Sequence, residues 1–208
     1  MEIKELSLNN NFLIFLIYIS LIGCDNYSKQ FEVKNFEKVD VSNIPGITVL
    51  ENDTLLKWDN GVYYFDNKLF SGYIISKYND SITKSIGSFY EGKRHGITKS
   101  FFSNGKLESE RNYKNGIGYG KHYGYWKNGN MKFEFIYYND KREGLQKQWY
   151  ENGNQYFELT FLNDKENGMQ KAWRENGKLY INYESKDGKR YGLQKSKLCF
   201  TLNDEKLQ

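Results

Sequence analysis

Proline is almost absent from this chain, which has a single proline, Pro45, among its 208 residues. Proline lacks a backbone N–H and breaks the hydrogen-bond ladder of a β-sheet, so the sequence after Pro45 is compatible with many consecutive strands. Cysteine is nearly as scarce, with two residues in the whole chain. Two cysteines provide neither a disulfide framework nor a set of metal ligands. We therefore expect no metal site.

The sequence also lacks the motifs of common catalytic sites. It contains no G-x-S-x-G, no H-E-x-x-H, no phosphate-binding glycine loop and no cysteine in a reactive context. The only histidines are His95 and His122, and a lone histidine is more often a surface polar residue than a catalytic base. We therefore expect a protein that is not an enzyme and that needs no cofactor.

A clustered basic stripe, which nucleic-acid-binding proteins carry, is missing too. The chain has 30 Lys and Arg against 26 Asp and Glu, a formal net charge of +4. The two signs are interspersed, as they are on the solvated face of a sheet. We expect no nucleic-acid partner.

The apolar run at the N-terminus is too short to span a bilayer. It covers residues 12–22, FLIFLIYISLI, whereas a membrane-spanning helix needs about 20 apolar residues. Its length is typical of the core of a signal peptide. Without export, the same run would form a buried hydrophobic strand or helix, and the cysteine that follows it would be an ordinary one.

The residues at the end of this run, Leu21-Ile22-Gly23-Cys24, resemble a bacterial lipobox. In signals of that family, cleavage precedes the cysteine and the cysteine is lipidated. The resemblance implies a signal peptide at residues 1–23, lipidation at Cys24 and attachment to a membrane of the bacterial cell envelope. Glu2 and Glu5 make this leader less basic than such leaders usually are.

A glycine repeat dominates the remainder of the chain. Six glycines follow one another at intervals of 24 residues: Gly72, Gly96, Gly120, Gly144, Gly168 and Gly192. A second glycine, in an Asn-Gly pair, follows four of them nine residues later: Gly105, Gly129, Gly153 and Gly177. A fixed period of this length identifies a repeat protein, and repeat arrays present extended surfaces.

Each 24-residue unit reads as one β-hairpin. In the clearest copy, residues 145–150 and 155–162 are rich in strand-forming side chains and flank the turn Glu151-Asn152-Gly153-Asn154. Asn163-Asp164-Lys165 forms a second turn that leads to the next unit. Asn-Gly suits a two-residue type I′ turn, in which both central residues have positive φ. The sequence therefore predicts a tandem array of hairpins.

The turn also predicts a register. With Asn-Gly as a two-residue loop, the third residue after each opening glycine pairs with the fourteenth. These pairs are Lys99 with Glu110, Tyr123 with Glu134, Lys147 with Glu158, and Lys171 with Asn182. The glutamates then align from hairpin to hairpin, either as a metal or acid/base site or as a solvated charge ladder. The absence of aspartate-rich loops with ligand spacing favours the ladder.

Aromatic residues recur at two adjacent positions of the repeat. The fifth residue after the opening glycine is Phe101, Tyr125, Trp149 or Trp173, and the sixth is Phe102, Trp126 or Tyr150. Neighbouring residues of a strand point to opposite faces, so each face carries an aromatic column. Such a column either shields the sheet in place of a core or forms a platform for a glycan, a peptide or a protein. We select the fifth-position column as the candidate binding face, centred on Trp149 and Trp173 lying side by side.

Residues 125–140, YWKNGNMKFEFIYYND, and 149–164, WYENGNQYFELTFLND, resemble the MORN-repeat variant, which occurs in bacterial proteins named YwqK-family antitoxins. The resemblance covers about residues 58–200. It implies an elongated, curved or twisted single-layer antiparallel sheet of successive hairpins. We expect an all-β protein with its array at residues 58–208, joined to the lipidated cysteine by a tether at residues 24–57.

We expect the array to bind an unknown protein or another component of the cell envelope, while Cys24 binds the bilayer. An antitoxin that neutralises one toxin or effector is the alternative. A glycan-binding protein or an accessory protein of an enzyme is a third.

Overall fold

The computed structural model describes residues 36–186 and 188–193. Cys24, the segment with the lipobox resemblance and the end of the chain from residue 194 lie outside the described residues. Within the described ranges, no helix could cross a bilayer.

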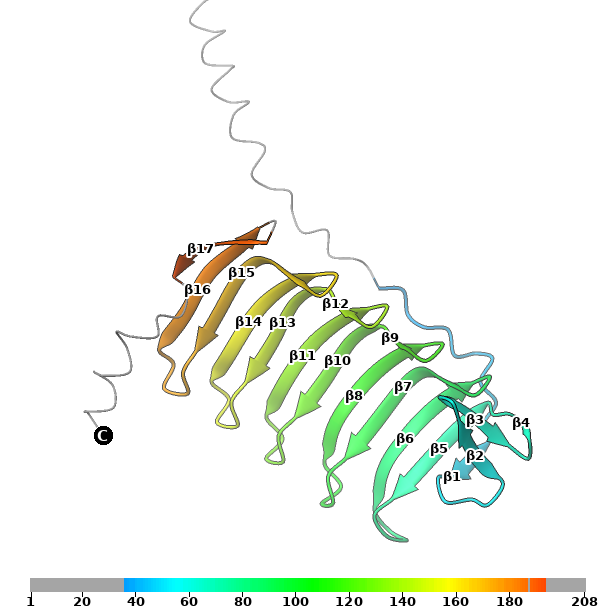
Figure 1. The fold of residues 1–208 in the computed structure, drawn as a ribbon. Coiled ribbons are helices and arrows are strands. Elements are labelled where there is room, and N and C mark those ends of the chain that lie inside the picture. The colour runs from blue at the N-terminus through cyan, green and yellow to red at the C-terminus, as the bar shows by residue number, and fades with distance from the viewer. Residues whose placement is uncertain (1–35, 187, 194–208) are drawn as a thin grey trace, which may run out of the picture. The chain divides into compact units, whose positions relative to one another are not determined.

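The described residues form 17 strands in two sheets (Figure 1). The strands are β1 (Thr48–Leu50), β2 (Leu56–Asp59), β3 (Val62–Phe65), β4 (Lys68–Leu69), β5 (Gly72–Lys77), β6 (Thr83–Tyr90), β7 (Lys93–Phe101), β8 (Leu107–Lys114), β9 (Ile117–Gly118), β10 (Gly120–Tyr125), β11 (Met131–Tyr138), β12 (Lys141–Arg142), β13 (Gly144–Trp149), β14 (Gln155–Leu162), β15 (Lys165–Trp173), β16 (Leu179–Lys186) and β17 (Lys189–Leu193).

The larger sheet has 14 strands and follows the order of the chain from β5 to β17. Every neighbouring pair is antiparallel except β1 with β5, which is parallel. Successive hairpins lie side by side in one layer, with the Asn-Gly turns along the lower edge in Figure 1 and the other turns along the upper edge. The predicted all-β array of tandem hairpins is confirmed.

The predicted register is confirmed in the four repeats for which it was derived. Lys99 is the partner of Glu110, and Lys147 is the partner of Glu158. Tyr123 lies opposite Glu134 in the same way. Lys171 lies opposite Asn182.

The predicted type I′ conformation of the Asn-Gly turns is wrong. Gly105 has a positive φ of 80°, but Asn104 is not among the residues with positive φ. Gly105 N donates to the Phe102 carbonyl at 2.8 Å, and Phe102 N donates to the Lys106 carbonyl at 2.8 Å. These two bonds close a three-residue loop, residues 103–105, in which glycine supplies the only left-handed residue.

The register survives because a β-bulge offsets the longer loop. Phe101 pairs with Leu107, but Ser100 pairs with Ser109, so Glu108 is an extra residue on the second strand. The same shift follows the Asn-Gly turn in the next three repeats. The three-residue loop has one residue more than expected on the first side of the turn, and the bulge has one more on the second strand. The two offsets cancel, so Lys99 still pairs with Glu110.

Asparagine is suited to this loop for a different reason from the one we expected. The Asn104 Oδ1 accepts a hydrogen bond from Lys106 N at 3.1 Å, and the Asn152 Oδ1 accepts one from Asn154 N at 2.9 Å. A side chain that mimics the backbone in this way stabilises the turn without a positive φ. Two-residue turns with positive φ at both positions occur instead at the opposite edge, for example at Asn163 (51°) and Asp164 (66°).

The opening glycines lie where one hairpin joins the next. All six have positive φ, from 73° at Gly144 to 146° at Gly72. Around Gly168 the pairing jumps from Leu159–Gln170 to Phe161–Glu166, so the chain bulges there. Glycine adopts this conformation without a steric penalty, which explains the 24-residue glycine period.

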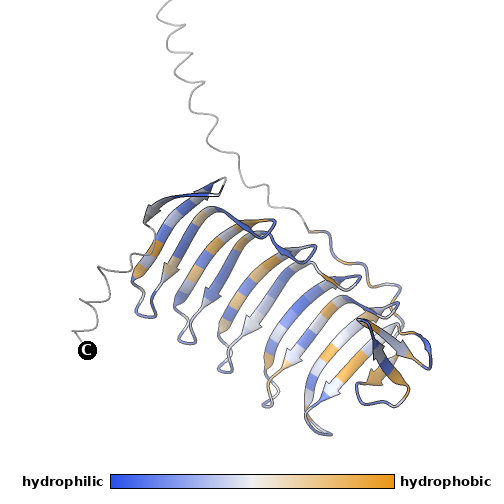
Figure 2. Ribbon diagram, viewed as in Figure 1, coloured by the Kyte–Doolittle hydropathy of each residue, from blue (hydrophilic) through white to orange (hydrophobic). Residues whose placement is uncertain are grey.

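Among the residues that the structure describes, a conventional hydrophobic core is found only at the start of the array. Val49, Phe70, Ile74 and Phe89 form a buried cluster, and Leu56, Tyr63 and Phe65 of the small sheet β2-β3-β4 pack against it. Beyond this end the described strands form one layer, on which polar and apolar residues alternate (Figure 2). Both faces of the sheet are therefore available to carry a site.

Part of the expected tether also contacts the array. Strand β1 pairs with β5, and Phe36 packs edge-on against Tyr119 with ring centroids 5.5 Å apart. The His95 ring bridges this segment to a turn, because its Nε2 lies 2.9 Å from the Asp40 carbonyl and its Nδ1 lies 2.8 Å from the Asn115 side chain. Both histidine nitrogens thus have structural partners.

Candidate binding surface

Strand alternation gives the array two chemically different faces. We call the face that carries Lys99 and Glu110 the ladder face. We call the opposite face, which carries the buried Gln146 and Gln170, the glutamine face. The fifth-position aromatic column lies on the ladder face, and the sixth-position residues follow on the other side.

A row of charged and polar residues crosses the middle of the ladder face. Its members are cross-strand neighbours from β7 to β16: Lys99, Glu110, Tyr123, Glu134, Lys147, Glu158, Lys171 and Asn182. Each of the three glutamates has a lysine as a cross-strand neighbour, so the row is a ladder of opposite charges.

The ion pairs of this ladder are largely solvated. Lys99 Nζ lies 3.3 Å from Glu110 Oε2, with side-chain exposures of 46% and 25%. Lys147 Nζ lies 4.0 Å from Glu158 Oε1. Exposed pairs of this kind contribute at most about 1 kcal/mol each. Among the described residues, no group of three or more His, Cys, Asp or Glu side chains is placed to hold a metal ion.

A second row lies beside the ladder, closer to the Asn-Gly turns, and we call it the aromatic row. It consists of the fifth-position residues and their cross-strand partners: Phe101, Leu107, Tyr125, Met131, Trp149, Gln155, Trp173 and Leu179. All eight are partly or fully exposed. The structure therefore brings the four candidate residues predicted from sequence into one row on one face.

The two tryptophans are not immediate neighbours, although the sequence suggested that they would lie side by side. Strand β14 runs between β13 and β15, and it places Gln155 opposite Trp149. Two strand spacings separate the rings of successive repeats, about 9.5 Å. The row is thus a set of evenly spaced rings.

Three sixth-position side chains, including Tyr78 six residues after Gly72, have a structural role that the sequence did not reveal. The Trp126 indole Nε1 donates to the Trp149 carbonyl at 3.1 Å, and the Tyr150 hydroxyl donates to the Trp173 carbonyl at 3.0 Å. Tyr78 bonds the Phe101 carbonyl in the same way at 3.1 Å. Each bond ties one repeat to the next at the backbone of the aromatic row.

Trp149 and Trp173 differ from Trp126 in this respect. Within the described part of the chain, their indole N–H groups make no hydrogen bond, and their carbonyls accept the bonds from Trp126 and Tyr150. Their rings are partly exposed. Because the array does not use these two donors internally, they remain available to a ligand.

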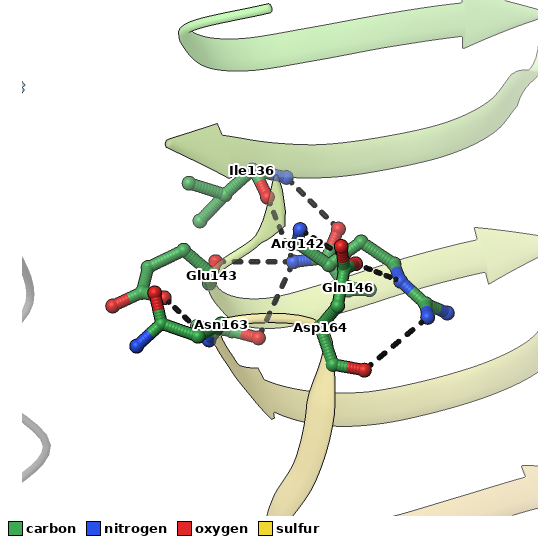
Figure 3. A network of polar contacts seen from close by, with 7 residues as sticks. Ile136, Arg142, Glu143, Gln146, Asn163 and Asp164 are labelled. Carbon is green, nitrogen blue, oxygen red and sulfur yellow. Dashed lines mark hydrogen bonds and ion pairs between the residues drawn. The ribbon is translucent and has the colours of Figure 1, made fainter. Parts of the chain in front are cut away.

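On the glutamine face, buried side chains make hydrogen bonds to backbone N–H and carbonyl groups. Gln146 is 1% exposed. It accepts from Ile136 N at 3.0 Å and donates to the carbonyls of Ile136 (3.1 Å) and Glu143 (3.0 Å), as Figure 3 shows. Gln170, at the same position of the next repeat, donates to the Thr160 carbonyl at 2.8 Å. These glutamines fill the bulges at the opening glycines.

His122 occupies the same position one repeat earlier. It is 7% exposed, and its Nε2 lies 2.8 Å from the Asn112 carbonyl, so this nitrogen carries the proton. Burial lowers the pKa of His122, although the bond to Asn112 opposes the shift. The expectation that this histidine is a surface residue is wrong. Its repeat position, two residues after the glycine, is the signal that would have identified it.

A further set of bonds joins repeats at the upper edge. The Asp164 carboxylate accepts from the Arg142 backbone N and side-chain Nε, both at 2.9 Å (Figure 3). The hydrogen bonds from Arg142 lower the pKa of the Asp164 carboxyl group. Asp140 accepts from Gly118 N in the preceding repeat at 2.6 Å. Both edges of the array are thus fixed, which keeps the aromatic row in register.

Comparison with known families agrees with this architecture. The model of the MORN repeat variant matches residues 94–115 and 142–163, which cover the β7–β8 hairpin except Lys93, cover the whole β13–β14 hairpin, and include Phe101 and Trp149. MORN repeats typically mediate binding. The chain matches no curated protein.

Proposed function

We propose that this protein is a non-enzymatic binding protein of the bacterial cell envelope. Its hairpin array binds a protein or another envelope component through the ladder face, and a lipid on Cys24 holds it at a membrane. The observation that carries the binding role is the aromatic row, in which four successive hairpins present one partly exposed ring each in the same register.

The chemistry of the row supports recognition as its role. Trp126 and Tyr150 serve the fold through their hydrogen bonds to the next repeat. Trp149 and Trp173 have no comparable bond within the described residues. Tryptophan and tyrosine dominate the energetics of many binding surfaces.

The membrane role is supported by the sequence Leu21-Ile22-Gly23-Cys24 alone. A single acyl chain gives only weak, reversible membrane binding, and stable attachment needs a second signal. Lipidation of a bacterial lipobox cysteine supplies several chains, so the array would remain at the membrane surface.

A pull-down from envelope extract tests the binding role. The bait is the full-length Cys24→Ser protein, compared with the same protein carrying Trp149→Ala and Trp173→Ala. Trp58→Ala is the matched control, because Trp58 is 65% exposed and lies in the small sheet, away from the row. We expect the double variant to keep its melting temperature and to lose the captured component, while the control retains it.

Two results would contradict this proposal. Equal capture by all three baits would show that the aromatic row does not bind. A marked loss of melting temperature in the double variant, with no separate binding defect, would show that the rings only shield the sheet. Capture of one stoichiometric protein that is toxic when expressed alone would favour the antitoxin alternative.

A further inference from the structure

The spacing of the aromatic row is its most restrictive property. One fifth-position ring recurs every second strand, from β7 through β10 and β13 to β15, at intervals of about 9.5 Å. The strands of the array keep nearly one direction across Figure 1, so the row crosses the sheet without interruption. A ligand that uses all four rings must repeat its own chemistry at this interval.

We propose that the aromatic row is a platform for an extended β-1,4-linked polysaccharide. This inference rests on the proposed function, in which the row is the binding surface, and it names the ligand class. In a β-1,4-linked chain, successive sugar rings are flipped, so every second ring presents the same face. The length of one such disaccharide is close to two strand spacings of a sheet. Each repeat of the array would therefore meet one disaccharide.

The side chains of the row have the chemistry for this ligand. A pyranose ring has a C–H face that packs on an aromatic ring, and Phe101, Tyr125, Trp149 and Trp173 offer one ring per repeat. The edges of the sugar ring carry hydroxyl groups, which need hydrogen-bond partners. The indole N–H groups of Trp149 and Trp173 are donors without a partner among the described residues.

The charge ladder supplies further partners alongside the rings. Lys147 and Lys171 precede their tryptophans by two residues on the same strand face, a distance of about 6.6 Å. Glu110, Glu134 and Glu158 alternate with lysine and tyrosine along the ladder. Alternating donors and acceptors suit a neutral, hydroxyl-rich chain better than a polymer of one charge.

The row is open at its first ring. A surface hollow of about 460 Å³ lies beside Phe101, lined by residues that include Ile82, Ile86, Ser103 and Asn104. It combines apolar and polar walls, as a bound sugar requires, and it continues the row toward β6. Such a surface binds the interior of a long chain, so affinity should increase with chain length.

The test measures binding of soluble oligosaccharides to the full-length Cys24→Ser protein by calorimetry. The probes are β-1,4-linked oligomers of glucose and of N-acetylglucosamine, with an α-1,4-linked glucose oligomer as the control. We expect affinity to rise with each added disaccharide up to about eight sugar units, because each of the four aromatic side chains would meet one disaccharide. Trp149→Ala and Trp173→Ala should each weaken binding about tenfold or more, and Trp58→Ala should not change it.

The outcomes separate this inference from the proposed function. Absence of binding to every β-1,4-linked probe would overturn the inference. If the envelope pull-down still depended on Trp149 and Trp173 and were abolished by protease treatment of the extract, the partner would be a protein and the proposed function would stand. If the pull-down showed no dependence on the tryptophans, both would be refuted.

Discussion

Replacing Gln146 with leucine tests how the single-layer array satisfies its backbone. Gln146 is 1% exposed, and leucine has a similar volume without polar atoms. The substitution removes the acceptor for Ile136 N and one donor to each of the carbonyls of Ile136 and Glu143. The Ile136 carbonyl keeps its bond from Glu143 N at 2.9 Å. The main effect is therefore that the Ile136 N–H loses its acceptor. A smaller effect is that the Glu143 carbonyl loses a donor.

The magnitude follows from these contacts. A buried donor or acceptor left without a partner costs about 1–3 kcal/mol, so we expect Gln146→Leu to lower the free energy of unfolding by about 2–4 kcal/mol. For a chain of this size the melting temperature should fall by roughly 5–15 °C. Thermal and urea unfolding of the full-length Cys24→Ser protein would measure the change.

Gln148→Leu is the matched control. Gln148 lies on the same strand and the same face as Gln146, but it is partly exposed, so its replacement should change stability by less than about 0.5 kcal/mol. Gln146→His should lower the free energy of unfolding less than Gln146→Leu does, because a histidine, His122, fills the equivalent position one repeat earlier. A Gln146→Leu protein as stable as the parent, or an equal loss in both leucine variants, would refute the assigned role.

Burial lowers the pKa of His122 below that of a free histidine, so the unfolded chain binds the proton more readily than the folded one. Stability should therefore fall as the pH drops below about 6.5, the ordinary pKa of histidine. The melting temperature measured at pH 7.5 and 5.5 should fall less in His122→Gln than in the parent, and an equal fall would contradict this. Gly153 has a φ of 91°, and a Cβ added to it would meet nothing closer than the Asn130 amide nitrogen at 3.9 Å, so Gly153→Val should cost about 1–2 kcal/mol through its backbone alone. Gly153→Asn should cost less, and an unchanged melting temperature in the valine variant would rule out strain at this turn. Cys24→Ser should release the protein from the membrane fraction and leave its melting temperature unchanged, whereas a full-length protein that still sediments with membranes would show another mode of attachment.

The fold could be predicted because the same hairpin pattern recurs in successive 24-residue repeats of the sequence. Six glycines in one register and four Asn-Gly pairs fix the hairpin length, and that length fixes the pairing of Lys99 with Glu110. The turn type could not be predicted from the same residues. Asn-Gly fits both a two-residue and a three-residue loop, and the choice depends on a bulge at Glu108 that no local pattern marks.

The candidate site was predictable in position but not in detail. Alternation along a strand separates the fifth and sixth aromatic positions reliably. The sequence could not show that Trp126 donates to a carbonyl of the next repeat, because that contact depends on packing between hairpins. The position of Gln146 was missed because isoleucine, threonine, histidine and glutamine all occupy it in different repeats, and these side chains share no chemical type.

The bonds that join the repeats give the array a modular character. In three hairpins the sixth-position side chain donates to the fifth-position carbonyl of the hairpin that follows: Tyr78 to Phe101, Trp126 to Trp149 and Tyr150 to Trp173. Phe102 has no donor and is the exception. Duplication of a unit that carries such a donor therefore repeats the same bond at the new junction. Such an event would add one ring at an unchanged spacing, so evolution can lengthen the aromatic row through contacts that the array already contains.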